Sequence, residues 1–218
     1  HLNDIIRQVY QHPSIHVSTG ATITEASGFV GNFVTKVMSQ GRVKEIHHGI
    51  TIIATGAEEH KPTEYLYGKD DRVITLLELE EQIASGEEKV ITSQSLVMIQ
   101  CVGCRQEDRN YCARVCCSQA IKNALKLKEK NPEMDIYIIY RDMRTYGFRE
   151  DYYREAASKG ITFIRYESND KPLVEAVEEG GQNILRVTAT DSVLGKKLAL
   201  DADLVALAAA VVPAADIN

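Results

Sequence analysis

The pattern of apolar and polar positions divides the chain into an α/β centre with an antiparallel β region on each side. At the start, apolar residues at helical spacing predict a helix over residues 2–10, which His12-Pro13 ends. Glycine-separated β segments then predict a small antiparallel meander, with strands at 22–24, 29–37 and 43–54. The run 49–56 is nearly all apolar and β-branched, so we expect a strand covered on both faces there.

The centre of the chain alternates strands and helices. Residues 57–92 are charged and predict a connecting region with one amphipathic helix, over 76–84. A strand, a helix, a strand, a helix and a strand follow, at 96–100, about 112–130, 135–140, 150–158 and 161–166. This order predicts a right-handed, parallel, Rossmann-like βαβαβ unit.

The last part of the chain resembles the first in its pattern. Strand-like segments predict a second meander, at 172–178, 183–189 and 196–200, and a buried strand follows at 203–208. The predicted fold class is therefore α/β, a βαβαβ unit flanked by antiparallel β meanders.

Composition and charge exclude several classes of protein. The 218 residues carry 25 Lys and Arg against 31 Asp and Glu, and a formal net charge of −6 lacks the basic footprint of a nucleic-acid-binding protein. No apolar run is long enough to span a bilayer, and we expect no secretory signal. An odd number of cysteines, five, argues against a secreted disulfide framework. We therefore expect a cytoplasmic protein whose thiols are reduced or bound to metal.

All five cysteines fall within residues 101–117, between a predicted strand end and a predicted helix start. Dinucleotide-binding turns read Gly-x-Gly-x-x-Gly at this place, whereas residues 100–105 read Gln-Cys-Val-Gly-Cys-Arg, which disfavours NAD(P) binding. Thiols from a strand end and a helix N-terminus can converge on a metal centre, and Arg105, Arg109 and Arg114 would favour thiolates. Spacing alone leaves three alternatives open: an iron–sulfur cluster, zinc or a redox pair, and inert thiols.

The segment 140–147, Tyr-Arg-Asp-Met-Arg-Thr-Tyr-Gly, follows a predicted strand at its carboxyl end, where doubly wound sheets bind ligands. Its arginines and tyrosines are suited to an anion or to the surroundings of the cysteines. The alternative for this segment is a solvated loop.

Seven segments of the chain are characteristic in combination. They are Gly-Phe-Val-Gly-Asn-Phe at 28–33, Ile-Ile-Ala-Thr-Gly at 52–56, Glu-Tyr-Leu-Tyr-Gly at 64–68, Gln-Cys-Val-Gly at 100–103, Tyr-Cys-Ala-Arg-Val-Cys-Cys at 111–117, the segment 140–147, and Ala-Leu-Asp-Ala-Asp-Leu-Val at 199–205. Together they resemble the A subunit of heterodisulfide reductase, over nearly the whole chain. The resemblance implies a flavin and iron–sulfur protein with a thioredoxin-reductase-like core.

In that core, an FAD-binding domain is interrupted by an insert that resembles an NAD domain. The resemblance implies a division into part of the FAD-binding domain, a connecting segment, the Rossmann-like insert with the cysteines, and a return to the FAD-binding domain, at 1–60, 61–92, 93–189 and 190–218. On this interpretation the chain begins and ends inside the FAD domain. We then expect a fragment that binds FAD weakly alone and is inactive in isolation.

The resemblance also implies binding sites. Cysteines matching the family pattern would be the ligands of an unusual [4Fe-4S] cluster: Cys101, Cys112, Cys116 and Cys117. Cys104 stands where the family more often has serine, so it is either a spare thiol or an alternative ligand. Ala54, Thr55 and Gly56 would approach the flavin of the full-length protein, and Ala21 and Thr22 its adenine. No catalytic residue is assigned.

The function implied is the electron-transfer portion of an oxidoreductase. It would relay electrons between FAD and iron–sulfur clusters, for the reduction of a CoM-S-S-CoB-type heterodisulfide by partner subunits. The implied partners are the other heterodisulfide reductase subunits and an electron-donating hydrogenase or dehydrogenase, with homodimerisation as an option and no nucleic acid or membrane. The alternative hypothesis is a non-catalytic interaction domain stapled by zinc or thiols.

Overall fold

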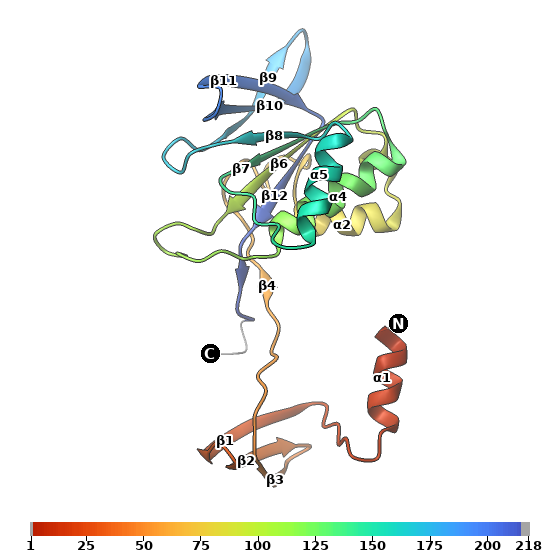
Figure 1. The fold of residues 1–218 in the computed structure, drawn as a ribbon, viewed down its shortest axis with the longest axis vertical. Helices are drawn as coiled ribbons and strands as arrows, with labels where there is room; N and C mark the ends of the chain where they lie inside the picture. The colour runs from red at the N-terminus through yellow and green to blue at the C-terminus, as the bar shows by residue number, and fades with distance from the viewer. Residues whose placement is uncertain (1, 215–218) are drawn as a thin grey trace. The chain divides into compact units, whose positions relative to one another are not determined.

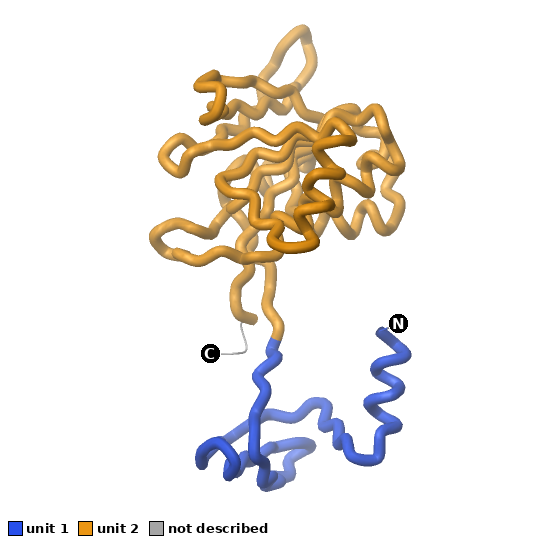
Figure 2. The backbone as a smooth tube through the Cα atoms, viewed as in Figure 1, with its two compact units in different colours: residues 1–55 blue, residues 56–218 orange. Residues whose placement is uncertain are grey.

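The computed structural model describes residues 2–214, which form two compact units divided between Thr55 and Gly56 (Figure 2). The helices are α1 (Leu2–Gln11), α2 (Leu76–Ser85), α3 (Glu88–Ile91), α4 (Cys116–Lys130) and α5 (Arg149–Ser158). The strands are β1 (Ala21–Phe29), β2 (Asn32–Ser39), β3 (Arg42–His48), β4 (Glu58–Glu59), β5 (Val73–Thr75), β6 (Ser95–Val102), β7 (Asp135–Tyr140), β8 (Thr162–Arg165), β9 (Leu173–Glu179), β10 (Gln182–Asp191), β11 (Lys196–Ala202), β12 (Leu204–Ala209) and β13 (Val211–Val212). No helix among these is both long and apolar enough to cross a bilayer.

The first unit consists of α1 and an antiparallel sheet in the order β1-β2-β3, which confirms the predicted helix and meander. Gly28 has φ +100°, and a side chain there would collide with the carbonyl oxygen of Asn32, so glycine is required beside the β1–β2 turn. Thr35 is the one buried residue among those described in this unit. The unit therefore has strands and a helix but no apolar core of its own.

The strand predicted over 49–56, with both faces covered, is wrong. β3 ends at His48, and the residues after it are extended without pairing to another described strand. Ile52 is 86% exposed and Ile53 is 81% exposed. The apolar, β-branched composition does favour an extended backbone, but burial also requires neighbouring elements, and none of the described residues in this unit supplies them.

The second unit is built on a five-stranded parallel sheet in the order β5-β12-β6-β7-β8 (Figure 1). The predicted alternation of strands and helices is confirmed from β6 through α4, β7 and α5 to β8. The predicted second meander is confirmed as β9, β10 and β11. The α/β fold class is therefore confirmed, with antiparallel meanders beside a parallel sheet.

The parallel sheet is buried on both faces, and alternate residues of its strands face different layers. On one face, Leu96 and Met98 of β6 pack with residues of α2, α4 and α5 such as Leu79, Ile121 and Ala156. On the other face, alternate residues of the same strands pack against the meander, among them Val97, Ile99, Val205, Leu185 and Val187. Burial on both faces explains the continuous apolar run that predicts β6.

The predicted division of this unit at residues 92 and 189 does not follow an edge of the sheet. β5 and α2 come from the predicted connecting segment, and β12 comes from the predicted return to the FAD-binding domain. β12 nevertheless pairs with both β5 and β6, and all six of its residues are buried. Residues 61–92 and 204–209 are thus parts of the same layered body as β6.

The start of α2 is fixed by a capping box. The Thr75 hydroxyl accepts a hydrogen bond from the Glu78 N–H at 3.2 Å, and the Glu78 carboxylate accepts one from the Thr75 N–H at 2.8 Å. Thr75 Oγ1 also donates to Glu59 Oε2 at 2.7 Å, which ties the helix to β4. The capping box holds the first turn of α2 against the sheet.

Candidate functional site

The five cysteines lie where β6 ends and α4 begins. Cys101 is the second-last residue of β6, Cys104 and Cys112 lie in the following loop, and Cys116 and Cys117 open α4. All five thiols are free, and Cys104, Cys116 and Cys117 are buried, while Cys101 and Cys112 are half-buried. Electrostatic interactions link Cys101 with Cys104, Cys116 and Cys117, so the structure brings these side chains into one region.

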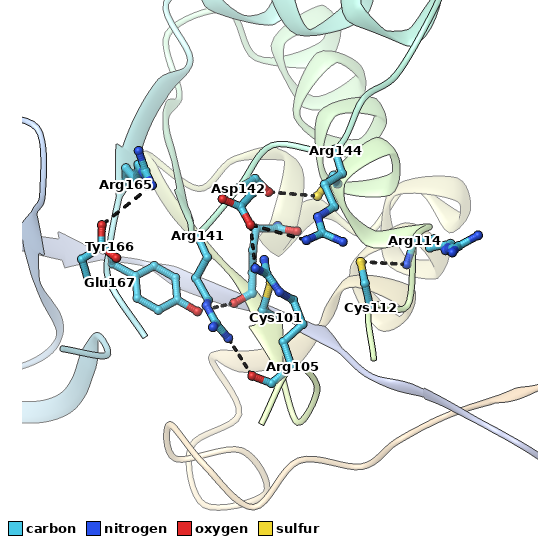
Figure 3. Close-up of polar contacts among 12 residues, drawn as sticks. Cys101, Arg105, Cys112, Arg114, Arg141, Asp142, Arg144, Arg165, Tyr166 and Glu167 are labelled. Atoms are coloured by element: carbon cyan, nitrogen blue, oxygen red, sulfur yellow. Dashed lines mark hydrogen bonds and ion pairs between the residues drawn. The ribbon is translucent and has the colours of Figure 1, made fainter. Parts of the chain in front are cut away.

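The helix predicted from about Cys112 begins four residues later, at Cys116, so that boundary is wrong. Arg114 has φ +64°, a left-handed conformation that an α-helix does not contain. The N–H of Arg114 donates to Cys112 Sγ at 3.4 Å (Figure 3). Cys112 is therefore a loop residue, placed by local backbone geometry and not by the helical spacing to Cys116.

Four of the thiols form two pairs, Cys101 with Cys104 and Cys116 with Cys117, and one thiol of each pair has a lowered pKa. The pKa of Cys101 is lowered to about 6, first by a hydrogen bond from Cys104 and next by Arg105, whose Nη1 lies 3.8 Å from the sulfur. The pKa of Cys117 is lowered to about 7, first by Cys116 and, against the effect of burial, by the N–H of Arg144. The pKa values of the partner thiols, Cys104 and Cys116, are raised. The region therefore favours a mixture of thiolates and thiols near neutral pH.

Arginines from two loops surround the thiols (Figure 3). Arg105 forms an ion pair with Asp142 at 2.6 Å, and Arg144 reaches the same carboxylate at 3.5 Å. Arg141 Nη1 donates to the Arg105 carbonyl at 2.9 Å, and Cys117 in its thiol form donates to the Asp142 carbonyl at 3.8 Å. The segment 140–147 is thus packed against the cysteine loop, and not a solvated loop.

The types of donor atom in this region, although not their spacing, suit a soft metal centre. Thiolates bind iron–sulfur clusters and zinc, and hydrogen bonds to the sulfurs stabilise such clusters. Buried polar atoms without partners among the described residues include both side-chain polar atoms of Gln100, next to Cys101, Ser118 Oγ, next to Cys117, and Thr145 Oγ1. Such groups would gain partners from a bound group. Within residues 2–214, no three His, Cys, Asp or Glu side chains are close enough together to hold a single metal ion.

The turn after β6 also opens on a cavity of about 380 Å³, lined by Cys101, Cys104, Arg141, Lys69 and Lys171 among others. Gly103 has φ +70°, and a side chain there would come within 2.7 Å of the His60 ring. Gly103 is therefore required because the His60 ring lies close to its backbone. In a phosphate-binding turn, by contrast, three glycines allow the backbone to approach a phosphate.

The residues predicted to contact FAD come from two segments of the chain. Ala21 and Thr22 lie on β1, paired with Ser39 and Met38 of β2. Ala54, Thr55 and Gly56 lie in the exposed segment after β3. Their role in FAD binding stays a prediction.

Sequence reasoning missed several residues of the cysteine region. His60 and Lys69 come from the predicted connecting segment, Lys171 from the loop before β9, and Arg149 from the start of α5. Their contacts depend on the order of the strands in the sheet, for which a single sequence gives no direct signal. Only the lone Gly103 in the turn could have indicated a close contact.

No family model matches the chain. Solved structures with a related arrangement include the thioredoxin reductase of T. acidophilum, with 17% identity, a TM-score of 0.42 and coverage of 89% of this chain and 53% of the other. The thioredoxin reductase of Lactococcus lactis has 18% identity, a TM-score of 0.46 and coverage of 91% and 56%.

Curated relatives are more similar in sequence. The A subunit of the H(2):CoB-CoM heterodisulfide,ferredoxin reductase of Methanothermobacter thermautotrophicus is 38% identical over 185 residues, which covers 78% of this chain and 27% of the relative. The iron-sulfur A subunit of the CoB--CoM heterodisulfide reductase of Methanocaldococcus jannaschii is 37% identical over 184 residues, covering 77% and 27%. The chain spans about a quarter of the length of these relatives. The chain is therefore a homologue of the heterodisulfide reductase A subunit, of which it corresponds to a portion.

Proposed function

We propose that this chain is the thiol-bearing, electron-transfer portion of a flavin and iron–sulfur oxidoreductase. The observation that supports the proposal is the gathering of free thiols at the end of β6 and the start of α4, where two of them have lowered pKa values and arginines surround them. Anionic clusters are stabilised by such a setting, because guanidinium groups and helix N-termini offset negative charge.

Cys101, Cys112, Cys116 and Cys117 would hold a [4Fe-4S] cluster. When bound, the cluster supplies a site that accepts and gives up one electron. The chain itself supplies thiolate ligands, a positive surrounding from Arg105, and burial that limits the access of water. Cys104 would remain a thiol that donates a hydrogen bond to Cys101 and would not be a ligand.

The names of the relatives support a wider proposal about the reaction and the partners of the whole protein. In those names the substrate is the CoB-CoM heterodisulfide, and one relative is named as an iron–sulfur protein. By homology, electrons would pass between FAD and clusters of partner subunits, which would reduce the heterodisulfide, and a hydrogenase or dehydrogenase would donate them. FAD would approach Ala54, Thr55 and Gly56, with Ala21 and Thr22 near its adenine.

Anaerobic reconstitution of the 218-residue chain with iron and sulfide tests the cluster. We expect bound iron and sulfide in equal amounts and broad absorption in the visible range, which Cys112→Ser should abolish. Cys104→Ser is the matched control, because it changes a neighbouring thiol in the same loop, and it should retain the iron. Loss of iron in Cys104→Ser would contradict the ligand assignment, and zinc without iron after reconstitution would favour the stapled interaction domain.

A further inference from the structure

A basic surface with exposed aromatic side chains adjoins the cysteine region. Arg114, Arg144, Tyr146 and Arg149 line a cavity of about 400 Å³. Among residues 2–214, no carboxylate forms an ion pair with Arg114 or Arg149, and Asp142 pairs with Arg144 at 3.5 Å. Three guanidinium groups share this cavity with little compensation from the chain, so it favours an anionic occupant.

Apolar side chains extend the same surface. Phe148 is 93% exposed and Tyr146 is 74% exposed, in the loop before α5. A second cavity of about 500 Å³ shares Arg149 and is lined between α4 and α5 by Val115, Ile121, Leu125 and Tyr152, among others. Exposed aromatic residues beside arginines are typical of the centres of protein–protein interfaces.

Two arginines of this surface, Arg114 and Arg149, differ from the arginines that act on the thiols. Arg105 and Arg144 contribute to the lowered pKa values of Cys101 and Cys117. Arg114 contacts Cys112 only through its backbone N–H, and its guanidinium group points away from that sulfur (Figure 3). Arg114 and Arg149 are exposed. Offsetting the negative charge of the thiolates therefore does not explain Arg114 and Arg149, although both lie close to the cysteine loop.

We propose that the surface formed by Arg114, Arg144, Tyr146, Phe148 and Arg149 is the docking site of a small acidic electron-carrier protein. The proposal rests on the proposed function, because docking here would bring the carrier's redox centre next to Cys112. Charge complementarity selects the occupant: the surface carries Arg114, Arg144 and Arg149, and Asp142 is the one carboxylate among residues 2–214 that pairs with any of them, in a chain of net charge −6. An acidic carrier is repelled by the rest of the chain and attracted to this surface.

An acidic bacterial ferredoxin with two [4Fe-4S] clusters is the probe. Its dissociation constant for the 218-residue chain is measured by calorimetry, with the cluster reconstituted and without metal, at low and at physiological salt. We expect binding at low salt that weakens strongly at physiological salt, because the screening length falls from about 30 Å at 0.01 M to about 8 Å at 0.15 M. Measuring binding to the metal-free chain tests docking independently of the cluster. If reconstitution yields no bound iron, the proposed function is contradicted, but the ferredoxin binding measurement still tests the docking site.

Charge-reversal variants locate the binding site. Arg114→Glu combined with Arg149→Glu should weaken binding by at least roughly tenfold. Lys196→Glu combined with Lys197→Glu, the same change of charge on exposed residues of β11, should weaken it by less than about twofold. Phe148→Ser should weaken binding at both salt concentrations, because it removes apolar contact area.

Four outcomes would overturn the proposal. The first is no binding of ferredoxin at low salt, and the second is equal weakening of binding by the two charge-reversal double variants. The third is a double arginine variant that still binds ferredoxin but loses iron. The fourth is self-association of the chain that the double arginine variant abolishes. The third would assign the arginines to the cluster, and the fourth would assign the surface to a second copy. Circular dichroism of each variant confirms that the fold is retained.

Discussion

The two three-stranded antiparallel sheets of this chain share a strand order, yet only one of them is part of a core. In β1–β3, the one buried residue described is Thr35. In β10, Leu185 and Val187 are completely buried against residues of the parallel sheet such as Val97. Strand-forming sequence therefore determines the backbone of both sheets, whereas stability depends on the layer that covers one of them.

The largest difference between the sheets should appear when the same side chain is shortened in each. Val187→Ala should lower the free energy of unfolding of the second unit by about 2 kcal/mol, because it removes buried methyl groups and leaves a cavity. Val43, in β3, is 63% exposed, and Val43→Ala is the matched control, expected to change stability by less than about 0.5 kcal/mol. Urea unfolding followed by circular dichroism measures both, and equal losses would show that β1–β3 is packed in solution.

The helices of the two units offer the next contrast. α1 has no buried residue, whereas α2 begins with a buried capping box. Thr75→Ala should cost about 1–2 kcal/mol, because it leaves the Glu78 N–H without its acceptor and breaks the bond to Glu59. Thr75→Ser retains the hydroxyl and should recover most of the loss in the same urea experiment. An alanine variant as stable as the serine variant would contradict the role of the cap.

A smaller difference between the two units should appear in the pH dependence of their stability. Asp70 accepts hydrogen bonds from Arg72, which also donates to the Asn183 carbonyl at 2.8 Å, and this pairing lowers the Asp70 pKa below its usual 3.8. The pairing therefore stabilises the second unit above that usual pKa, and the contribution disappears as the pH falls through the lowered value. Asp70→Asn should destabilise the unit by about 1 kcal/mol at pH 7 and by less near pH 3.

Thermal unfolding at the two pH values measures this change. The ion pair of Lys36 with Glu25 in the first unit is exposed at both side chains, so Glu25→Gln serves as the control and should have little effect at either pH. A loss in Asp70→Asn that is independent of pH would show that the contribution does not come from ionisation of Asp70.

The smallest effect on stability is expected at the exposed isoleucines after β3. Ile52→Ser combined with Ile53→Ser should leave the unfolding of the second unit unchanged, because both side chains are already more than four-fifths exposed. The same variant should reduce the fluorescence of a bound hydrophobic dye, since it removes an exposed apolar patch. Unchanged dye binding would indicate that these isoleucines are covered in solution.

Local patterns in the sequence predict much of the second unit. The apolar run of β6, the periodicity of α4 and the glycine after α5 identify the elements, because each signal lies within the element itself. Gly160 has φ +80°, as expected for the residue that follows the C-cap of α5, Lys159. The position of β12 between β5 and β6 is not predictable in this way, because strand order depends on contacts between residues far apart in the chain.

Local sequence patterns likewise predict only part of the candidate site. The strand end and the helix start indicate that the thiols converge, and the structure brings Cys101 and Cys117 into one electrostatic environment. The predicted position of Cys112 on the helix is wrong because helical periodicity does not reveal the left-handed backbone of Arg114. His60 and Arg149 reach the region through the packing of β4 and α5, which local patterns do not contain.

The position of β12 has a consequence for synthesis of the protein. β6 is complete at Val102, but its neighbour on one side, β12, begins at Leu204, about 100 residues later. At about 5–20 residues per second, a ribosome needs roughly 5–20 s to produce that stretch. During this interval the strand that carries Cys101 has an open, apolar edge, which is the kind of edge that pairs with other chains. Until β12 pairs with β6, this edge of the nascent chain is therefore open to pairing with other chains.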